Sequence, residues 1–217
     1  MGKKTPTGKA SKKGTVREYA EAFIIAFVIA MLIRTFLVQA FKIPSSSMEP
    51  TLLVGDHILV SKFIYGIRIP YIGKKFLTFH KPNRGNIIVF VYPEDPKKDF
   101  IKRVIATGGE EVQIKNRKIF INGREIEDLW GVYRERDGPF VPSHFRPGDN
   151  YGPRIVPPNC LFVMGDNRDN SQDSRYWGFV DLSAVKGKAF IIYFSYNKRT
   201  TNLLDKVRWS RFGKLLQ

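Results

Sequence analysis

The sequence predicts a mostly β domain of antiparallel sheets arranged like a barrel, with a smaller inserted β lobe, preceded by one N-terminal transmembrane helix. Two observations predict this class. Residues 20–41 form one long, almost uninterrupted apolar segment. Beyond residue 41, short runs of β-branched and aromatic residues alternate with Gly, Pro, Asn and Asp, and no stretch keeps a helical period. We therefore divide the chain of 217 residues into a basic tail (1–17), an anchor (18–41) and a β domain (42–217) whose lobe is inserted at about 108–158.

The anchor prediction depends on length and polarity. The 22 residues from Ala20 to Phe41 are interrupted only by Glu21, Arg34, Thr35 and Gln39, and a helix of about 20 mostly apolar residues spans a bilayer. A buried core helix and a cleaved secretory signal are the alternatives, but the segment exceeds the ~7–15 apolar residues of a signal peptide. Residues 1–17 hold six Lys and Arg and no acid, which predicts a cytoplasmic N-terminus and an external domain.

The strand predictions follow from short β-branched and aromatic runs bounded by turn residues. These runs are residues 57–64, 86–92, 100–107, 111–115, 118–121, 160–165 and 188–194. Asn122-Gly123 between two alternating runs is a strong hairpin signal. The Gly/Pro/Asp-rich passage 128–159 predicts loops of the inserted lobe. In the tail "LLDKVRWSRFGKLLQ" the apolar residues do not gather on one helical face, so it only weakly supports an interfacial helix.

Charge and cysteine content limit the classes of partner. The net charge is +16, of which residues 42–217 carry +11, so the domain attracts anionic lipid headgroups or nucleic acid. Cys160 is the only cysteine, which excludes a disulfide within the chain and a cysteine-based metal site.

Lys102 is the first candidate for chemistry. Strand alternation places it on one face with Phe100 and Val104, where desolvation would lower its pKa and favour the neutral amine. A neutral lysine can take the proton of a serine, as in Ser-Lys variants of the catalytic triad. The strand pattern alone favours a different reading, a water-facing lysine on an edge strand. Structural or solvated roles are favoured for the three histidines, His57, His80 and His144, over a Ser-His-Asp triad.

The stretch "MGDNRDNSQDSRYWGF" (164–179) follows an apolar run and mixes Asp, Asn and Ser with two arginines. A calcium loop is one interpretation, but the Gly and the distal Glu of an EF-hand loop are missing. The two arginines favour a salt-bridged turn instead.

Three stretches together resemble the type I signal peptidases, the membrane-anchored serine proteases of bacteria. "IPSSSMEPTL" (43–52) resembles their nucleophile motif, "DFIKRVIATGGE" (99–110) their lysine motif, and residues 164–179 their acidic-arginine motif. The resemblance extends from the anchor to about residue 195. It implies a Ser-Lys serine endopeptidase that cleaves signal peptides after small-x-small sites through an acyl-enzyme, without a metal or cofactor.

The resemblance also implies roles for individual residues. Ser47 would be the nucleophile and Lys102 the general base. The oxyanion hole would consist of the Ser45 hydroxyl and the backbone N–H of Ser47, while Ser171 would orient the lysine. The remaining implied residues are a structural ion pair, Asp173 with Arg175, and a shallow substrate pocket near Phe41, Ile43, Leu52 and Ile101. Ser46 falls at a position that is variable in the family, often Gly.

The expected partners are the signal peptides of exported preproteins and the lipid bilayer, with no nucleic acid and a monomeric chain. The expected location is the inner (cytoplasmic) membrane, crossed once, although many relatives from bacteria with an outer membrane have two spans. Two alternatives stay open. One is a membrane-tethered basic β domain that binds an acidic polymer or nucleic acid without catalysis, and the other is a Ser-Lys peptidase dedicated to one exported substrate.

Overall fold

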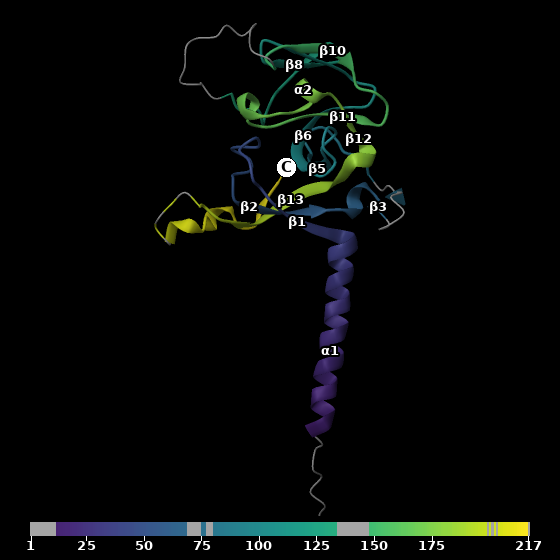
Figure 1. Cartoon of the computed structure of the whole chain (residues 1–217). Coiled ribbons are helices and arrows are strands. Elements are labelled where there is room, and N and C mark those ends of the chain that lie inside the picture. The colour runs from purple at the N-terminus through teal and green to yellow at the C-terminus, as the bar shows by residue number, and fades with distance from the viewer. Residues whose placement is uncertain are drawn as a thin grey trace, which may run out of the picture.

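The computed structural model describes residues 12–68, 75–76, 80–133, 148–198, 200, 202 and 204–216. Helix α1 (Lys12–Leu32) projects away from the β domain (Figure 1). A π-helical turn (Ile33–Leu37) follows it and leads directly into strand β1 (Val38–Lys42). Within the described residues, no helix combines the length and the apolar character needed to cross a membrane.

The last four residues of the predicted anchor are not helical. Residues 38–41 lie in β1, which pairs antiparallel with β2 in the register Val38↔Ser61 to Lys42↔His57. Phe41 packs against the main hydrophobic core from this strand. An apolar run satisfies a helix and a buried strand equally well, and here the cross-strand partners decide for the strand.

The main sheet has eight strands in the order β1-β2-β13-β5-β6-β11-β12, with β14 added beside β13. Besides β1, these are β2 (Asp56–Ser61), β5 (Ile87–Val91), β6 (Asp99–Thr107), β11 (Cys160–Met164), β12 (Val180–Asp181), β13 (Val185–Ser195) and β14 (Lys214–Leu215). Every pairing is antiparallel, as predicted. The barrel-like closure is not found, because β1 and β12 end the order without pairing to one another in the described chain.

A second sheet lies at the end of the domain far from α1 (Figure 1). Its order is β10-β7-β8-β9. The strands are β7 (Glu111–Lys115), β8 (Lys118–Ile121), β9 (Arg124–Ile126) and β10 (Tyr151–Ile155). The predicted hairpin at Asn122-Gly123 is confirmed, since β8 and β9 pair across it.

β10 corrects the prediction of loops in this part of the chain. Its sequence "YGPRI" contains Gly and Pro, which strands disfavour. The pairing with β7 accommodates them through a register shift between Tyr151 and Arg154. The short elements include a ribbon of β3 (Ile67–Arg68) with β4 (Lys75–Phe76), and helix α2 (Ser174–Trp177). Five single turns of 3-10 helix are also present in the described residues: Phe63–Tyr65, Arg168–Asn170, Leu182–Ala184, Leu204–Lys206 and Trp209–Arg211.

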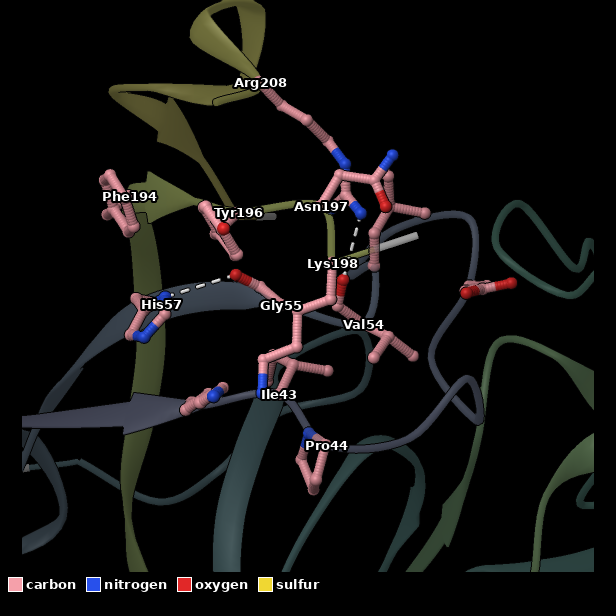
Figure 2. A pocket seen from close by; sticks show the side chains of 13 residues that line it. Ile43, Pro44, Val54, Gly55, His57, Phe194, Tyr196, Asn197, Lys198 and Arg208 are labelled. Atoms are coloured by element: carbon pink, nitrogen blue, oxygen red, sulfur yellow. Dashed lines mark hydrogen bonds between the residues drawn. The ribbon is translucent and has the colours of Figure 1, made fainter. Parts of the chain in front are cut away.

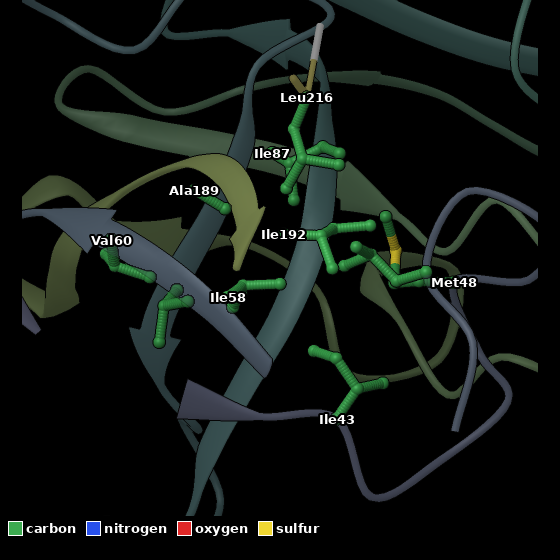
Figure 3. Packing of buried hydrophobic residues seen from close by; sticks show 10 residues of the cluster. Ile43, Met48, Ile58, Val60, Ile87, Ala189, Ile192 and Leu216 are labelled. Atoms are coloured by element: carbon green, nitrogen blue, oxygen red, sulfur yellow. The ribbon is translucent and has the colours of Figure 1, made fainter. Parts of the chain in front are cut away.

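The buried apolar side chains form three clusters. One cluster lies beneath the turn that joins β1 to β2 (Figure 3). It consists of Ile43, Met48, Leu52, Ile58, Val60, Ile87, Val89, Ala189, Ile192 and Leu216. Met48 and Leu52 are 0% exposed, and burying each such side chain contributes about 1.5–3 kcal/mol. The packing of these two side chains into the core thus fixes the turn between β1 and β2.

Candidate active site

Ser47 lies on the β1–β2 turn and Lys102 in the middle of β6. The Lys102 amine donates a hydrogen bond to the Ser47 hydroxyl, with 2.6 Å between Nζ and Oγ. The two residues are 7% and 3% exposed. A base and a nucleophile within hydrogen-bond reach, shielded from water, form the arrangement that nucleophilic catalysis requires.

Lys102 does not lie on an edge strand. β6 pairs with β5 on one side and with β11 on the other, so the water-facing alternative is wrong. Burial lowers the pKa of Lys102 from 10.5 to about 8. Asp173 and Asp166 act against this shift and Arg175 adds to it, but the loss of hydration dominates. At pH near 8, about half of the molecules then hold a neutral amine.

The other two serines of the turn have different surroundings. Ser45 Oγ, one of the two expected oxyanion donors, lies 3.5 Å from Ser47 Oγ. Ser46 Oγ instead accepts a hydrogen bond from Asn170 Nδ2 at 2.7 Å. Of the three, only the Ser47 hydroxyl receives the lysine amine.

Ser171 is brought to the site but does not bond to Lys102. It is buried, and its hydroxyl has no hydrogen-bond partner among the described residues. A Cβ atom at Gly165 would lie 2.3 Å from Ser171 Oγ and 2.4 Å from the Ser47 carbonyl oxygen. Ser171 and Ser47 therefore flank Gly165, and only a residue without a side chain fits between them.

Asp173 and Arg175 form a buried bidentate ion pair. Arg175 Nε and Nη2 donate to the two carboxylate oxygens of Asp173 at 2.8 and 2.9 Å. Asp173 also accepts from the backbone N–H of Gly165 at 3.0 Å and from that of Arg175 at the start of α2. The pair thus holds the glycine that separates Ser171 from Ser47.

The acidic-arginine stretch makes salt bridges both within itself and with distant parts of the described chain. Arg168 pairs with Asp128, and Asp166 pairs with Arg103 on β6. In the described ranges no group of three or more His, Cys, Asp or Glu could hold a metal ion. The calcium-loop alternative therefore gains no support. The stretch is a salt-bridged turn, but some of its ion-pair partners lie elsewhere in the chain.

Arg103 and Asn167 are site residues that the sequence analysis missed. Arg103 donates twice to Asp166, at 2.8 and 2.7 Å, with both side chains 1% exposed. The Arg103 guanidinium also lies over the Trp130 ring, 4.7 Å from its centroid. Asn167 donates its backbone N–H to the Ser47 carbonyl and its Nδ2 to the Ser46 carbonyl, each at 3.1 Å. The alternation that placed Lys102 on one face of β6 also placed Arg103 on the opposite face. A charged residue on each face of one strand was a signal that Arg103 needs a buried partner.

The four predicted pocket residues lie together, but not all at the surface. Ile43 and Leu52 are buried in the core cluster, and Phe41 and Ile101 are half-buried against it. Only Phe41 and Ile101 present surface to a substrate. A cavity of about 750 Å³ includes Ile43 in its wall but none of the other three predicted pocket residues (Figure 2). It is lined by Lys42, Ile43, Pro44, Glu49, Leu53, Val54, Gly55, His57, Phe194, Tyr196, Asn197, Lys198 and Arg208.

The two histidines in the described part of the chain, His57 and His80, make no bond to Ser47 or Lys102. His57 Nδ1 donates to the Gly55 carbonyl at 3.2 Å (Figure 2). His80 is exposed, and His144 lies outside the described residues. The Ser-His-Asp alternative therefore gains no support.

Comparison with known proteins identifies the family. The family model described as signal peptidase, peptidase S26, matches residues 16–194. A signal peptidase I of Pseudomonas fluorescens is 40% identical over 215 residues, covering 87% of this chain and 76% of the relative. One from Pseudomonas aeruginosa is 37% identical, covering 94% and 81%. A crystal structure of a signal peptidase I from Enterococcus faecalis V583 is 31% identical over 50% of this chain and 97% of its own, but its TM-score of 0.39 carries no weight. On the family match and the curated relatives, the chain belongs to the signal peptidase family, peptidase S26, and is a serine peptidase.

Proposed function

We propose that this chain is a membrane-anchored endopeptidase that removes N-terminal signal peptides from exported preproteins after small-x-small sites. Ser47 is the nucleophile and Lys102 the general base. The observation that carries this assignment is the 2.6 Å contact between the two side chains. Because burial lowers the pKa of Lys102 to about 8, the amine can act as a base near neutral pH.

The first half of the reaction forms an acyl-enzyme. Neutral Lys102 takes the hydroxyl proton of Ser47 as its Oγ attacks the scissile carbonyl carbon. The Ser45 hydroxyl and the backbone N–H of Ser47 stabilise the oxyanion, a contribution of about 3–4 kcal/mol per donor. The protonated lysine then gives its proton to the leaving amine, which is the new N-terminus of the mature protein.

The second half returns the enzyme to its starting state. Lys102, neutral again, activates a water molecule that attacks the ester between Ser47 and the signal peptide. Collapse of this second intermediate releases the peptide carboxylate and restores the Ser47 hydroxyl. No step calls for a metal or a cofactor. Ser171, which lies across Gly165 from Ser47, orients the lysine.

The substrate binds as an added strand. β1 ends the order of the main sheet, and an edge strand offers its backbone N–H and C=O groups to an extended peptide. β1 leads directly into the turn of Ser47, so a peptide paired with β1 passes the nucleophile. Phe41 and Ile101, half-buried against the core, contact the small side chains before the cut.

Helix α1 and the π-helical turn anchor the chain in the bilayer, with residues 1–17 in the cytoplasm and the catalytic domain outside. The large apolar side chains of α1 are about half exposed or more, for example 72% at Phe23 and 55% at Phe27. Large apolar side chains that the protein leaves exposed in this way are stabilised when lipid surrounds them. Resistance of the full chain to alkaline extraction from membranes, lost on deletion of residues 1–37, tests this anchoring.

The decisive experiment incubates the purified full chain with a preprotein bearing an A-x-A site and locates the cut by mass spectrometry. Ser47→Ala should abolish cleavage. Ser46→Ala, its matched control on the same turn, should keep activity within about threefold, because Ser46 bonds to Asn170 and not to Lys102. If Ser46→Ala alone is inactive, the nucleophile is misassigned. Cleavage of only one among several unrelated preproteins would favour the dedicated peptidase.

A further inference from the structure

The C-terminal segment (residues 204–216) packs against the turn that carries Ser47. It follows β13, and its strand β14 pairs back onto β13. Figure 1 shows this yellow segment at the left of the main sheet, near β2 and β13. Leu216, near its end, is 7% exposed and belongs to the core cluster of Met48 and Leu52. The segment lies beyond residue 194, where the family match ends.

Arg211 ties the segment to the β1–β2 turn. Its Nη2 donates to Asp56 Oδ2 at 2.6 Å and to the Thr51 carbonyl at 2.9 Å, and its Nε donates to both Asp56 oxygens at 3.0 and 3.1 Å. Asp56 is 0% exposed, and its Oδ2 also accepts the backbone N–H of Leu53 at 2.8 Å. One buried carboxylate therefore joins the guanidinium to the backbone of the turn.

Arg208 makes a second set of contacts with the same turn. Its Nη2 donates to the Val54 carbonyl at 3.1 Å, drawn as a dashed line in Figure 2, and its Nη1 to Ser195 Oγ at 3.1 Å. Ser195 Oγ in turn donates to Asp56 Oδ1 at 2.6 Å. The two partly exposed arginines join the buried side chains of Asp56 and Ser195 in one hydrogen-bonded network.

The backbone just after β13 closes on the turn at Gly55. Tyr196 donates its N–H to the Gly55 carbonyl at 3.0 Å. Gly55 has a φ of +93°, and a Cβ atom there would lie 2.0 Å from the Tyr196 carbonyl oxygen. The close approach therefore requires glycine, and it leaves the turn little freedom to move away from the C-terminal residues.

The held residues are coupled to the nucleophile through a short path. The backbone N–H of Leu52 donates to the Met48 carbonyl at 2.9 Å, and Met48 directly follows Ser47. Both Met48 and Leu52 are 0% exposed. A shift of residues 51–56 would move Met48 and change the 2.6 Å distance from Ser47 Oγ to Lys102 Nζ.

We propose that Arg208 and Arg211, acting through Asp56, are positioning residues that hold the Ser47 turn at the distance from Lys102 that the reaction needs. The C-terminal segment then sets the rate of catalysis and not only the stability of the domain. The inference rests on the proposed roles of Ser47 and Lys102.

The test compares Arg211→Ala with Lys214→Ala in the full chain in detergent micelles. Both changes remove one positive charge from the same segment, but the Lys214 side chain is exposed in β14. For Arg211→Ala we expect kcat to fall at least about tenfold with KM within about twofold, since misplacement of about 1 Å costs up to about a hundredfold in rate. Lys214→Ala should retain wild-type kcat. All rates are taken well below each variant's melting temperature.

Two outcomes would overturn the proposal. A lower melting temperature with wild-type kcat would make the network purely structural, and a raised KM with unchanged kcat would place it in substrate binding. Should Arg211→Ala fail to fold, Arg211→Lys replaces it. An ammonium cannot hold the Asp56 carboxylate bidentately and the Thr51 carbonyl together, so we expect an intermediate kcat. A wild-type kcat in folded Arg211→Lys would also count against the proposal.

Hydrogen exchange gives a readout that needs no substrate. In the Arg211 variant the amides of Leu52, Leu53 and Gly55 should exchange faster, while those of β6 and β11 should not change. Unaltered exchange at the turn, whatever the rate of cleavage, would refute the positioning role. If the wild-type chain cleaves no preprotein, the proposed function fails, while the exchange data still decide whether the segment holds the turn.

Discussion

Replacing Lys102 by methionine should abolish cleavage and make the protein more stable. The two effects have one cause, the burial of the amine. Lys102 is 3% exposed, and burial lowers its pKa from 10.5 to about 8. The folded state therefore holds the charged lysine, its main form at pH 7, at a cost. A shift of this size corresponds to about 3 kcal/mol.

Methionine keeps much of the apolar bulk of lysine and carries no charge. It also removes the hydrogen bond to Ser47, which is worth about 1 kcal/mol. The net gain in unfolding free energy at pH 7 is then about 2 kcal/mol. For a chain of this length such a gain raises the melting temperature by about 4–8 °C.

The sign of the pH dependence makes the test sharper. Between pH 8 and 10.5 the unfolded chain binds more protons at this lysine than the folded protein does, so the stability of the wild type rises with pH across this window. The advantage of Lys102→Met is complete below pH 8 and disappears toward pH 10.5. Thermal melts of both proteins in detergent micelles from pH 6 to 10.5 measure it.

The reasoning fails if Lys102→Met melts at or below the wild-type temperature at pH 7, or if the difference does not shrink as pH rises. Substantial remaining cleavage by this variant would separately rule out Lys102 as the base. Ser47→Ala is the matched control. It is expected to abolish cleavage but to keep the buried amine, so its stability should still rise between pH 8 and 10.5 as that of the wild type does.

Further predictions concern the pH profile, the oxyanion donor and the glycine between the serines. Because the base must be neutral and the pKa of Lys102 is about 8, kcat/KM should fall about tenfold per pH unit below 8 and level off above it; a flat profile to pH 5 contradicts a lysine base. Ser45→Ala should lower kcat about 10²–10³-fold with KM nearly unchanged in steady-state assays, as for other oxyanion donors; unchanged kcat would remove Ser45 from the oxyanion hole. Gly165→Ala should inactivate or unfold the protein, since its Cβ would lie 2.3 Å from Ser171 Oγ; an active, stable variant, checked by cleavage and melting, would show that this contact yields easily.

Much of the β structure could be predicted from local pattern. β7 and β8 have the predicted bounds, because each is a short alternating run closed by turn residues. Residues 38–41 of β1 were assigned to the anchor, since a mostly apolar run carries no clear period that separates helix from strand. β10 was missed because Gly152 and Pro153 hide a strand that only its partner β7 and a register shift make possible.

The contacts of the site were harder to predict because they join distant parts of the chain. Motif resemblance named Ser47 and Lys102, which the structure brings together. It named Ser171 as a partner of Lys102, but no such bond is present. The network of Asp56 with Arg208 and Arg211 could not be foreseen, because a short basic and apolar tail has the same composition whether it lies free or packs against a turn.

The low pKa of Lys102 depends on where the nearby carboxylates are engaged. Asp166 and Asp173 each raise that pKa, and a carboxylate without a cationic partner beside the amine would hold it protonated. Asp166 is instead paired bidentately with Arg103, and Asp173 with Arg175. Each acid meets an arginine whose charge cannot be lost, so desolvation remains the largest influence on the lysine. Lys102 and Arg103, adjacent on β6, thus differ in charge state. Arg103 keeps its charge in a buried ion pair with Asp166. Because that pair engages the Asp166 carboxylate, it helps Lys102 to become neutral.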